Sequence, residues 1–128
     1  MASFPKVVAI FYATFDFQAG SKILVQSPDE IICPTSPSSL FDFTSLSEYI
    51  IPKKDLCNRL VNIVAPTGYR ILGYPVHIPN NKYERNFLIF NLGFVFRENE
   101  EIASYIPVVR RLAMTFRQLE VSTTLSGL

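Results

Sequence analysis

The sequence is poor in the residues that build metal and redox centres. Its 128 residues include two cysteines and one histidine. Cys33 and Cys57 do not form a C-x-x-C spacing, and with His77 they supply fewer ligands than a zinc site usually takes. The sequence therefore predicts no bound metal and two reduced cysteines. A disulfide between Cys33 and Cys57 is the alternative.

An excess of charge and a long apolar run are also missing. The net charge is +1, which gives no electrostatic reason to expect nucleic acid or an anionic membrane as a partner. Adjacent basic residues occur only at Lys53-Lys54 and Arg110-Arg111. No apolar run approaches the roughly 20 residues of a membrane-spanning helix. We therefore expect a cytoplasmic protein.

The chain does have a large apolar content, with 48% hydrophobic residues. A chain of this length suffices for one domain with one core. Such a content is high for a small domain. It predicts that part of the apolar surface covers a partner.

Two stretches are almost continuously apolar, residues 7–15 and residues 87–96. Runs rich in aromatic and β-branched residues are typical of strands buried on both faces. Gly93 and the turn-forming residues 79–82 favour a strand over a buried helix for the second run. We expect the two strands to lie side by side in the middle of a sheet.

The intervening chain predicts shorter strands and a loop. Residues 16–20 form a turn in which Gly20 can take a positive φ, and residues 21–26 return as a second strand. Three prolines among serines and threonines make residues 28–39 a mobile surface loop. Residues 60–64 and residues 69–78 are expected to be strands.

Two of these features carry more detail. Pro75 lies inside the predicted strand 69–78, which suits an edge position or a bulge. His77 alternates with Val76 and Ile78, so it should point to the opposite face. Without other ligands nearby, we interpret it as a surface histidine.

Helical spacing of apolar residues occurs twice. Residues 38–51 form an amphipathic segment that Ser38 or Thr44 could cap and that Pro52 ends. The last helix has Pro107 in its first turn and Ser104 as its expected N-cap. The predicted order is ββαβββα, an α+β (α/β) domain with a five-stranded, mainly antiparallel sheet and helices packed on it.

This order is similar to the longin and roadblock family of small domains. The residues narrow the resemblance to the N-terminal domain of the nitrogen permease regulator 2 family, from about residue 7 to about residue 121. The segments that carry it are Ile10-Phe11-Tyr12, Gly20-Ser21-Lys22-Ile23, Leu40-Phe41-Asp42, Tyr49-Ile50-Ile51, Leu72-Gly73-Tyr74-Pro75-Val76, Lys82-Tyr83-Glu84-Arg85-Asn86 and Phe90-Asn91-Leu92-Gly93-Phe94-Val95.

The resemblance implies that residues 1–128 are one longin domain, the N-terminal part of a longer protein. Members of this family pair with nitrogen permease regulator 3 through their longin domains and join a third subunit. The resulting GATOR-type (SEACIT-type) complex activates GTP hydrolysis by a Rag GTPase and restrains the TOR kinase when amino acids or nitrogen are scarce. The implied location is cytoplasmic, and peripheral at the vacuole or lysosome membrane through partners.

The same resemblance implies a catalytic role for Arg85, as an arginine finger supplied in trans, with Tyr83 and Asn86 supporting its loop. A planar guanidinium can stabilise the charge on a transferring phosphoryl group, and a rigid strand just after it provides the base that such a finger needs. The chain itself is then not an enzyme and binds no cofactor, because GTP and Mg²⁺ are held by the partner GTPase.

One alternative is a non-catalytic longin scaffold that only mediates heterodimer assembly, with the chemistry elsewhere. Pairing is expected along a sheet edge or through the helix in residues 40–51, and the isolated domain can form a homodimer instead. An enzyme in its own right is the weakest hypothesis, because the sequence has no nucleophile–base pair or glycine-rich phosphate loop.

Overall fold

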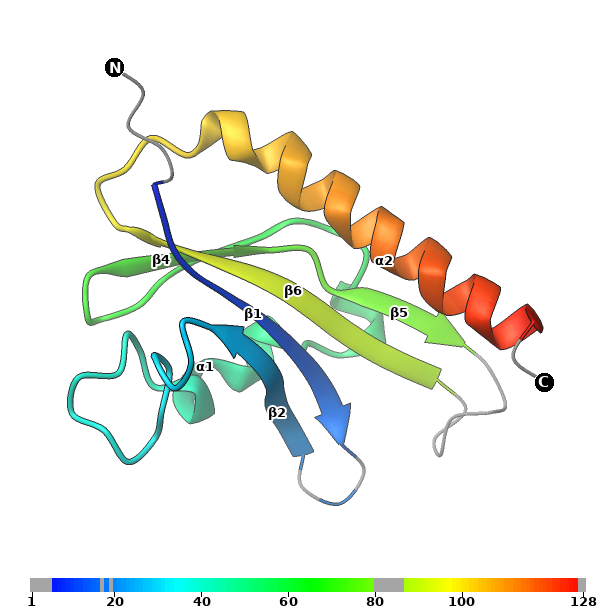
Figure 1. Ribbon diagram of the computed structural model, residues 1–128, viewed down its shortest axis with the longest axis horizontal. Helices are drawn as coiled ribbons and strands as arrows, with labels where there is room; N and C mark the ends of the chain where they lie inside the picture. The colour runs from blue at the N-terminus through cyan, green and yellow to red at the C-terminus, as the bar shows by residue number, and fades with distance from the viewer. Residues whose placement is uncertain (1–5, 17, 19, 80–86, 127–128) are drawn as a thin grey trace.

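The computed structural model describes residues 6–16, 18, 20–79 and 87–126. Within these ranges the chain folds into six strands, two α-helices and two short 3-10 turns (Figure 1). The elements are β1 (Val7–Asp16), β2 (Gly20–Ser27), α1 (Phe43–Ile50), η1 (Lys54–Leu56), β3 (Val61–Val64), β4 (Tyr69–Gly73), β5 (Val76–Pro79), β6 (Phe87–Arg97), η2 (Ala103–Tyr105) and α2 (Ile106–Ser126).

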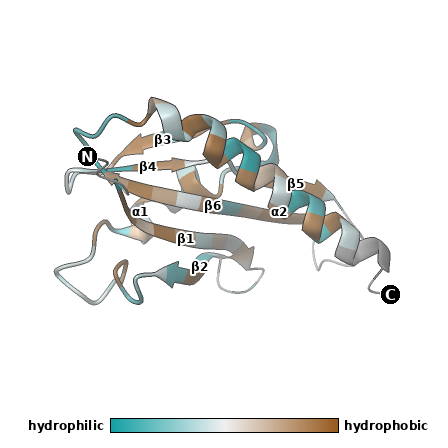
Figure 2. Ribbon diagram, turned by 45° about the horizontal axis from the view of Figure 1, so that its top comes forward, coloured by the Kyte–Doolittle hydropathy of each residue, from teal (hydrophilic) through white to brown (hydrophobic). Residues whose placement is uncertain are grey.

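The two most apolar runs are neighbours in the middle of the sheet, as the sequence predicts. The strand order is β2-β1-β6-β4-β3, with β5 also paired to β6, and every pair is antiparallel. Strand β6 is buried along nearly its whole length because it has strands on both sides and helices over both faces. Figure 2 shows the hydrophobic colouring that results along β1 and β6.

The helices cover opposite faces of the sheet and create two core layers (Figure 1). Phe11, Phe41 and Ile50 belong to the layer under α1, whereas Phe90 and Val109 belong to the layer under α2. Gly20 begins β2 directly after the turn of the β1–β2 hairpin, and its φ of 81° is the positive value that the turn requires. The mixed α/β architecture with a mainly antiparallel sheet is confirmed and is consistent with a longin-like fold.

The sheet has six strands where the sequence predicts five, because the strand expected at residues 69–78 is divided. Tyr69 faces Arg97 and Pro79 faces Phe87, so β4 and β5 keep one continuous register against β6. Pro75 has no N–H to donate and interrupts the ladder between them. Of the two alternatives for Pro75, the edge position is confirmed, because among the described residues β5 pairs only with β6. The bulge is wrong, because no residue is inserted there.

The first helix is shorter than its amphipathic pattern suggests. It begins at Phe43, not near residue 38, and ends at Ile50. Neither Ser38 nor Thr44 caps it, because the Asp42 carboxylate accepts the hydrogen bond from the Thr44 N–H at 3.1 Å. Ser39 instead bonds within the preceding loop, which keeps residues 38–41 out of the helix.

The last helix matches its prediction except at the start. Ser104 lies inside the turn η2 and is not an N-cap, while Ala103 N–H is bonded to the Glu101 carboxylate. Pro107 is the second residue of α2, within the first turn, as expected. Apolar and polar residues alternate around α2, and its apolar side faces β6 (Figure 2).

The loop in residues 28–39 is anchored at its base. The Gln26 side-chain amide exchanges two hydrogen bonds with the backbone of Ile32, at 2.7 and 3.1 Å. Ile32 and Leu40 are buried in the layer under α1, and Leu40 N–H donates to the Ile31 carbonyl. The predicted mobility of the loop concerns the chain between these anchors and stays a prediction.

Candidate functional site

The residues that the sequence singles out for function, Tyr83, Arg85 and Asn86, lie outside the described residues. The structure does describe both ends of the segment that carries them. Pro79 and Phe87 face each other as the last pair of the β5–β6 ladder. Facing Cα atoms in such a ladder are about 4.5–5.5 Å apart. The described chain therefore leaves the sheet at Pro79 and re-enters it at Phe87 at one point, beside the start of its most buried strand.

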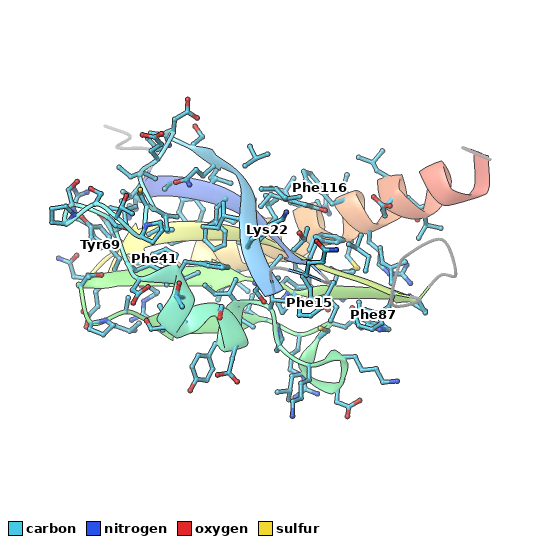
Figure 3. The ribbon with its side chains drawn as sticks, turned by 90° about the horizontal axis from the view of Figure 1, so that it is seen from below. Phe15, Lys22, Phe41, Tyr69, Phe87 and Phe116 are labelled. Carbon is cyan, nitrogen blue, oxygen red and sulfur yellow. The ribbon has the colours of Figure 1, made fainter. Side chains whose placement is uncertain are left out.

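Aromatic packing defines this point. The rings of His77 and Phe87 are 5.2 Å apart between centroids, on the face of the sheet that α1 covers. Burial and the nearby Lys54 ammonium lower the pKa of His77, which favours the neutral imidazole. Phe15 lies near Phe87 in Figure 3, and both line a pocket that Lys53 also borders.

The interruption between β4 and β5 is held by a buried asparagine. Asn91 is fully buried, and its side-chain Oδ1 accepts from the Tyr74 N–H at 3.1 Å. Its Nδ2 donates to the Ile50 carbonyl at 2.8 Å, at the end of α1. Gly73 permits this arrangement, because a β carbon there would overlap the Asn91 amide. The gap at Pro75 is thus tied to α1.

Exposed apolar side chains gather around the edge strand β3 and the end of helix α1. We define the β3–α1 surface by Tyr49, Leu56, Leu60, Val61 and Ile63, which line one shallow pocket of about 290 Å³. Tyr49 and Leu56 are 62% and 52% exposed, although both are large hydrophobic residues. Among the described residues, β3 pairs only with β4. An open strand edge beside exposed apolar side chains is typical of a protein interface.

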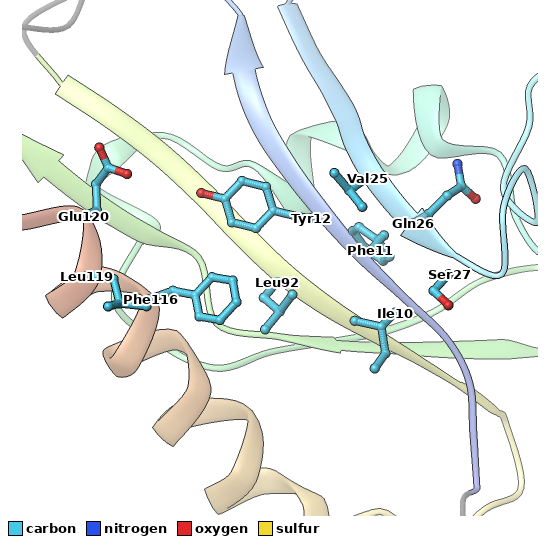
Figure 4. A pocket seen from close by; sticks show the side chains of 10 residues that line it. All are labelled: Ile10, Phe11, Tyr12, Val25, Gln26, Ser27, Leu92, Phe116, Leu119 and Glu120. Carbon is cyan, nitrogen blue, oxygen red and sulfur yellow. The ribbon is translucent and has the colours of Figure 1, made fainter. Parts of the chain in front are cut away.

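A second apolar surface lies at the other edge of the sheet. A groove of about 570 Å³ runs between α2 and the strands β1 and β2 (Figure 4). Ile10, Leu92 and Phe116 line it together with Val25 and Leu119, which are 67% and 60% exposed. Its lining is mainly apolar. Among the described residues that line it, Glu120 is the one acidic or basic side chain.

No group of three or more His, Cys, Asp or Glu side chains in residues 6–16, 18, 20–79 and 87–126 is placed to hold a metal. Cys33 and Cys57 are free thiols, so the disulfide alternative is wrong. In the same part of the chain, no helix is long and apolar enough to cross a membrane.

The interruption between β4 and β5 is also bonded to Asn58, whose N–H donates to the Pro75 carbonyl at 2.7 Å and whose carbonyl accepts from the Tyr74 hydroxyl at 2.9 Å. Sequence reasoning missed these roles of Asn58, Tyr74 and Asn91. Asn91 and Tyr74 belong to the family-like motifs, and no sequence pattern points to Asn58. A proline inside a strand pattern was the available indication, because a missing backbone donor has to be matched by side-chain bonds nearby.

Comparison with known proteins agrees with the resemblance seen in the sequence. The family model described as Nitrogen permease regulator 2 matches residues 5–127. The Nitrogen permease regulator 2 homolog of Schizosaccharomyces pombe is 38% identical over 118 residues, covering 91% of this chain and 29% of that protein. Nitrogen permease regulator 2 of Saccharomyces cerevisiae is 38% identical over 121 residues, covering 91% of this chain and 18% of that protein.

An animal relative matches at the same level. The GATOR complex protein NPRL2 of Drosophila melanogaster is 38% identical over 109 residues, which cover 84% of this chain and 25% of that protein. The chain thus spans less than a third of the length of each of these relatives. With a family model that matches almost all of its residues, the chain belongs to the nitrogen permease regulator 2 family.

Proposed function

We propose that this domain acts in a GATOR-type complex that activates GTP hydrolysis by a Rag GTPase and restrains TOR signalling when amino acids or nitrogen are scarce. Family membership is the observation that carries the proposal. The Drosophila relative is itself named a GATOR complex protein. In this proposal the complex works at the vacuole or lysosome membrane, and the chain reaches that membrane through its partners.

The proposed catalytic group is Arg85, supplied in trans as an arginine finger, with Tyr83 and Asn86 supporting its loop. The position of the loop ends supports this role. Pro79 and Phe87 are fixed in the sheet, and β6 behind Phe87 is the most buried strand. A finger needs such a rigid base, because misplacing a guanidinium by about 1 Å costs much of its effect on the transition state. GTP and Mg²⁺ would be bound by the GTPase.

The proposed partner of the β3–α1 surface is the longin domain of nitrogen permease regulator 3. Tyr49, Leu56 and Leu60 supply exposed apolar area there, and the open edge of β3 can accept another strand. The polar residues Arg59 and Asn62 border the same pocket, as expected for an interface rim. The same surface also favours the second candidate function, a scaffold that assembles the complex without contributing to hydrolysis.

Substitution of Arg85 separates these two functions. An arginine finger contributes a factor on the order of 10³–10⁵ to the rate. In the full-length protein assembled with its partners, we expect Arg85→Ala to abolish nearly all stimulated single-turnover GTP hydrolysis. Arg85→Lys should rescue it poorly, because an ammonium keeps the charge but loses the planar fork of donors.

Arg111→Ala is the matched control, because Arg111 is an exposed arginine on α2. It should leave hydrolysis and assembly unchanged. Full stimulation by Arg85→Ala in an intact complex would reject the finger and favour the scaffold. Full stimulation by Arg85→Lys would mean that Arg85 acts only as a positive charge.

A further inference from the structure

The turn between η1 and β3 presents apolar side chains outward. It is also hydrogen-bonded to Tyr74 and Pro75, the two residues that form the gap between β4 and β5. Leu56 and Leu60 lie on the β3–α1 surface at the two ends of this turn. Between them, the Asn58 N–H donates to the Pro75 carbonyl at 2.7 Å. The Tyr74 hydroxyl donates to the Asn58 carbonyl at 2.9 Å. Both backbone polar groups of Asn58 are therefore bonded to the gap.

The conformation of this turn depends on those bonds. Asn58 has a φ of 63°, in the left-handed region that non-glycine residues seldom occupy and that asparagine tolerates best. Neighbouring Cys57 is buried in the layer under α1 and anchors the turn on one side. Movement of the turn would therefore strain its bonds to Tyr74 and Pro75.

The other end of α1 reaches the same gap. Asn91 bonds the Tyr74 N–H and the Ile50 carbonyl, at 3.1 and 2.8 Å. Thus both components of the β3–α1 surface, the helix end and the turn, are tied to one short stretch of backbone around Pro75.

From this stretch the chain leads directly to the segment that carries Arg85. Strand β5 starts at Val76, and the His77 ring contacts the Phe87 ring at 5.2 Å. Two residues later Pro79 forms the last pair with Phe87. The gap between β4 and β5 therefore connects the β3–α1 surface on one side with the base of residues 80–86 on the other.

We infer that Tyr74 and Asn58 are positioning residues that transmit pairing at the β3–α1 surface to the base of the Arg85 loop. This inference rests on the proposed function. A sister domain that covers Leu56 and Leu60 restricts the turn, and the bonds of Asn58 pass the restriction to β5. Coupling of this kind travels through contiguous bonded and packed groups. The consequence of this coupling is that a finger would be fully effective only in the assembled complex.

Tyr74→Phe is the sharpest test, because it removes the hydroxyl bond to Asn58 and keeps the ring. The variant is made in the full-length protein and assembled with its partner subunits. We expect an intact complex whose maximal single-turnover rate of GTP hydrolysis falls about 2- to 10-fold, the range that one hydrogen bond accounts for. The concentration of complex that gives half-maximal stimulation should stay unchanged.

Tyr105→Phe provides a matched control. The Tyr105 hydroxyl accepts a hydrogen bond from the Lys6 N–H at 3.4 Å, on the side of the sheet that α2 covers. Among the hydrogen bonds of the described residues, none joins the Tyr105 hydroxyl to Tyr74 or Pro75. Removal of this hydroxyl should therefore leave the rate of hydrolysis unchanged. An equal loss of rate in both tyrosine variants would mean general destabilisation and would reject the coupling through Tyr74 and Asn58.

Hydrogen exchange gives a second readout that does not depend on hydrolysis. Peptides covering β5 and the start of β6 should exchange more slowly when the full-length wild-type protein pairs with regulator 3. In Tyr74→Phe this added protection should be smaller, although pairing persists. Equal protection in both proteins would overturn the inference.

The failure of this inference and of the proposed function are distinguishable. If Arg85→Ala is inactive while Tyr74→Phe has the wild-type rate, the finger stands and the coupling through Tyr74 is rejected. If Arg85→Ala has the wild-type rate, the proposed function itself fails, and the inference that depends on it fails too.

Discussion

At the scale of single residues, two glycines and one asparagine of the family-like motifs have structural explanations. Gly93 faces Phe11 across the β1–β6 ladder, and a β carbon at Gly93 would overlap the Phe11 ring. Gly73 likewise leaves room for the Asn91 amide, which a β carbon at Gly73 would overlap. These residues pack the centre of the fold. Their presence in a motif is therefore not evidence for a chemical role.

Gly93→Ala should destabilise the domain. Phe11 is 1% exposed and lies against Phe41 and Phe43, so its ring cannot move away freely. Inserting a methyl group into a well-packed core costs about 1–3 kcal/mol. The free energy of unfolding, measured by chemical denaturation of the 128-residue chain, should fall by an amount in that range.

A second substitution tests the stated cause. Phe11→Leu removes the part of the ring that the new methyl group would meet, so Gly93→Ala should cost less in a Phe11→Leu background. A double-mutant cycle measures this coupling. If the two substitutions are additive, the Phe11 ring is not the obstacle and the effect of Gly93→Ala has another origin.

The two thiols should differ in reactivity. A hydrogen bond with the Thr35 hydroxyl, 3.3 Å from its sulfur, lowers the pKa of Cys33, which is only partly covered. Burial raises the pKa of Cys57 to about 11. Because the thiolate is the reactive form, a disulfide reagent at pH 8 should modify Cys33 quickly and Cys57 only after unfolding.

Each modified thiol releases one equivalent of the reagent's coloured thiol. The native chain should therefore release one equivalent and the denatured chain two. Cys33→Ser should remove the fast reaction, while Cys57→Ser should keep it. Fast reaction of the Cys33→Ser variant in its native state would show that Cys57 is accessible, which contradicts its burial.

At the scale of elements, the hydrophobic pattern was sufficient to predict a strand or helix wherever that element's packing depends on its own residues alone. Strands β1 and β6 are almost continuously apolar and helix α2 has one apolar side, so each could be predicted from its own residues. Pro75 divides the β4–β5 segment, but the bonds that hold the interrupted backbone come from Asn58 and Asn91, which are distant in sequence. Local pattern reasoning does not include such bonds.

The start of α1 shows the same limitation. Apolar spacing continues from Leu40 into the helix, yet Leu40 N–H is bonded to the Ile31 carbonyl across the preceding loop. That long-range bond, together with the Asp42 cap, sets the first helical residue. The candidate site was predictable only in part. Arg85 came from the resemblance, whereas the hydrogen bonds that join Asn58 to Pro75 and Tyr74 are visible only in the fold.

At the scale of the whole molecule, exposed apolar residues occur at opposite edges of the sheet. One group forms the β3–α1 surface, and the other lines the groove between α2 and β1–β2. The β3–α1 surface combines an open strand edge with a helix, and hydrogen bonds of Asn58 join its turn to Tyr74 and Pro75. These features make it the better candidate for the sister longin domain.

Charge substitution at the two surfaces can identify the one that pairs. Leu56 and Val25 are 52% and 67% exposed, so glutamate at either position should be tolerated by the fold. Leu56→Glu should weaken binding of the regulator 3 longin domain about tenfold or more, because pairing would bury a charge without a partner. Val25→Glu should bind like the wild type. Titration of each variant with the regulator 3 longin domain, followed by sedimentation or calorimetry, measures the two dissociation constants.

The unpaired domain adds an independent check on the same surface. If the isolated wild-type chain forms a homodimer at high concentration, Leu56→Glu should shift it to the monomer and Val25→Glu should not. Thermal unfolding of each variant establishes that the fold is intact before binding is compared. Weakened pairing by Val25→Glu, with Leu56→Glu unaffected, would move the sister domain to the groove beside α2 and remove the structural basis for coupling through Asn58.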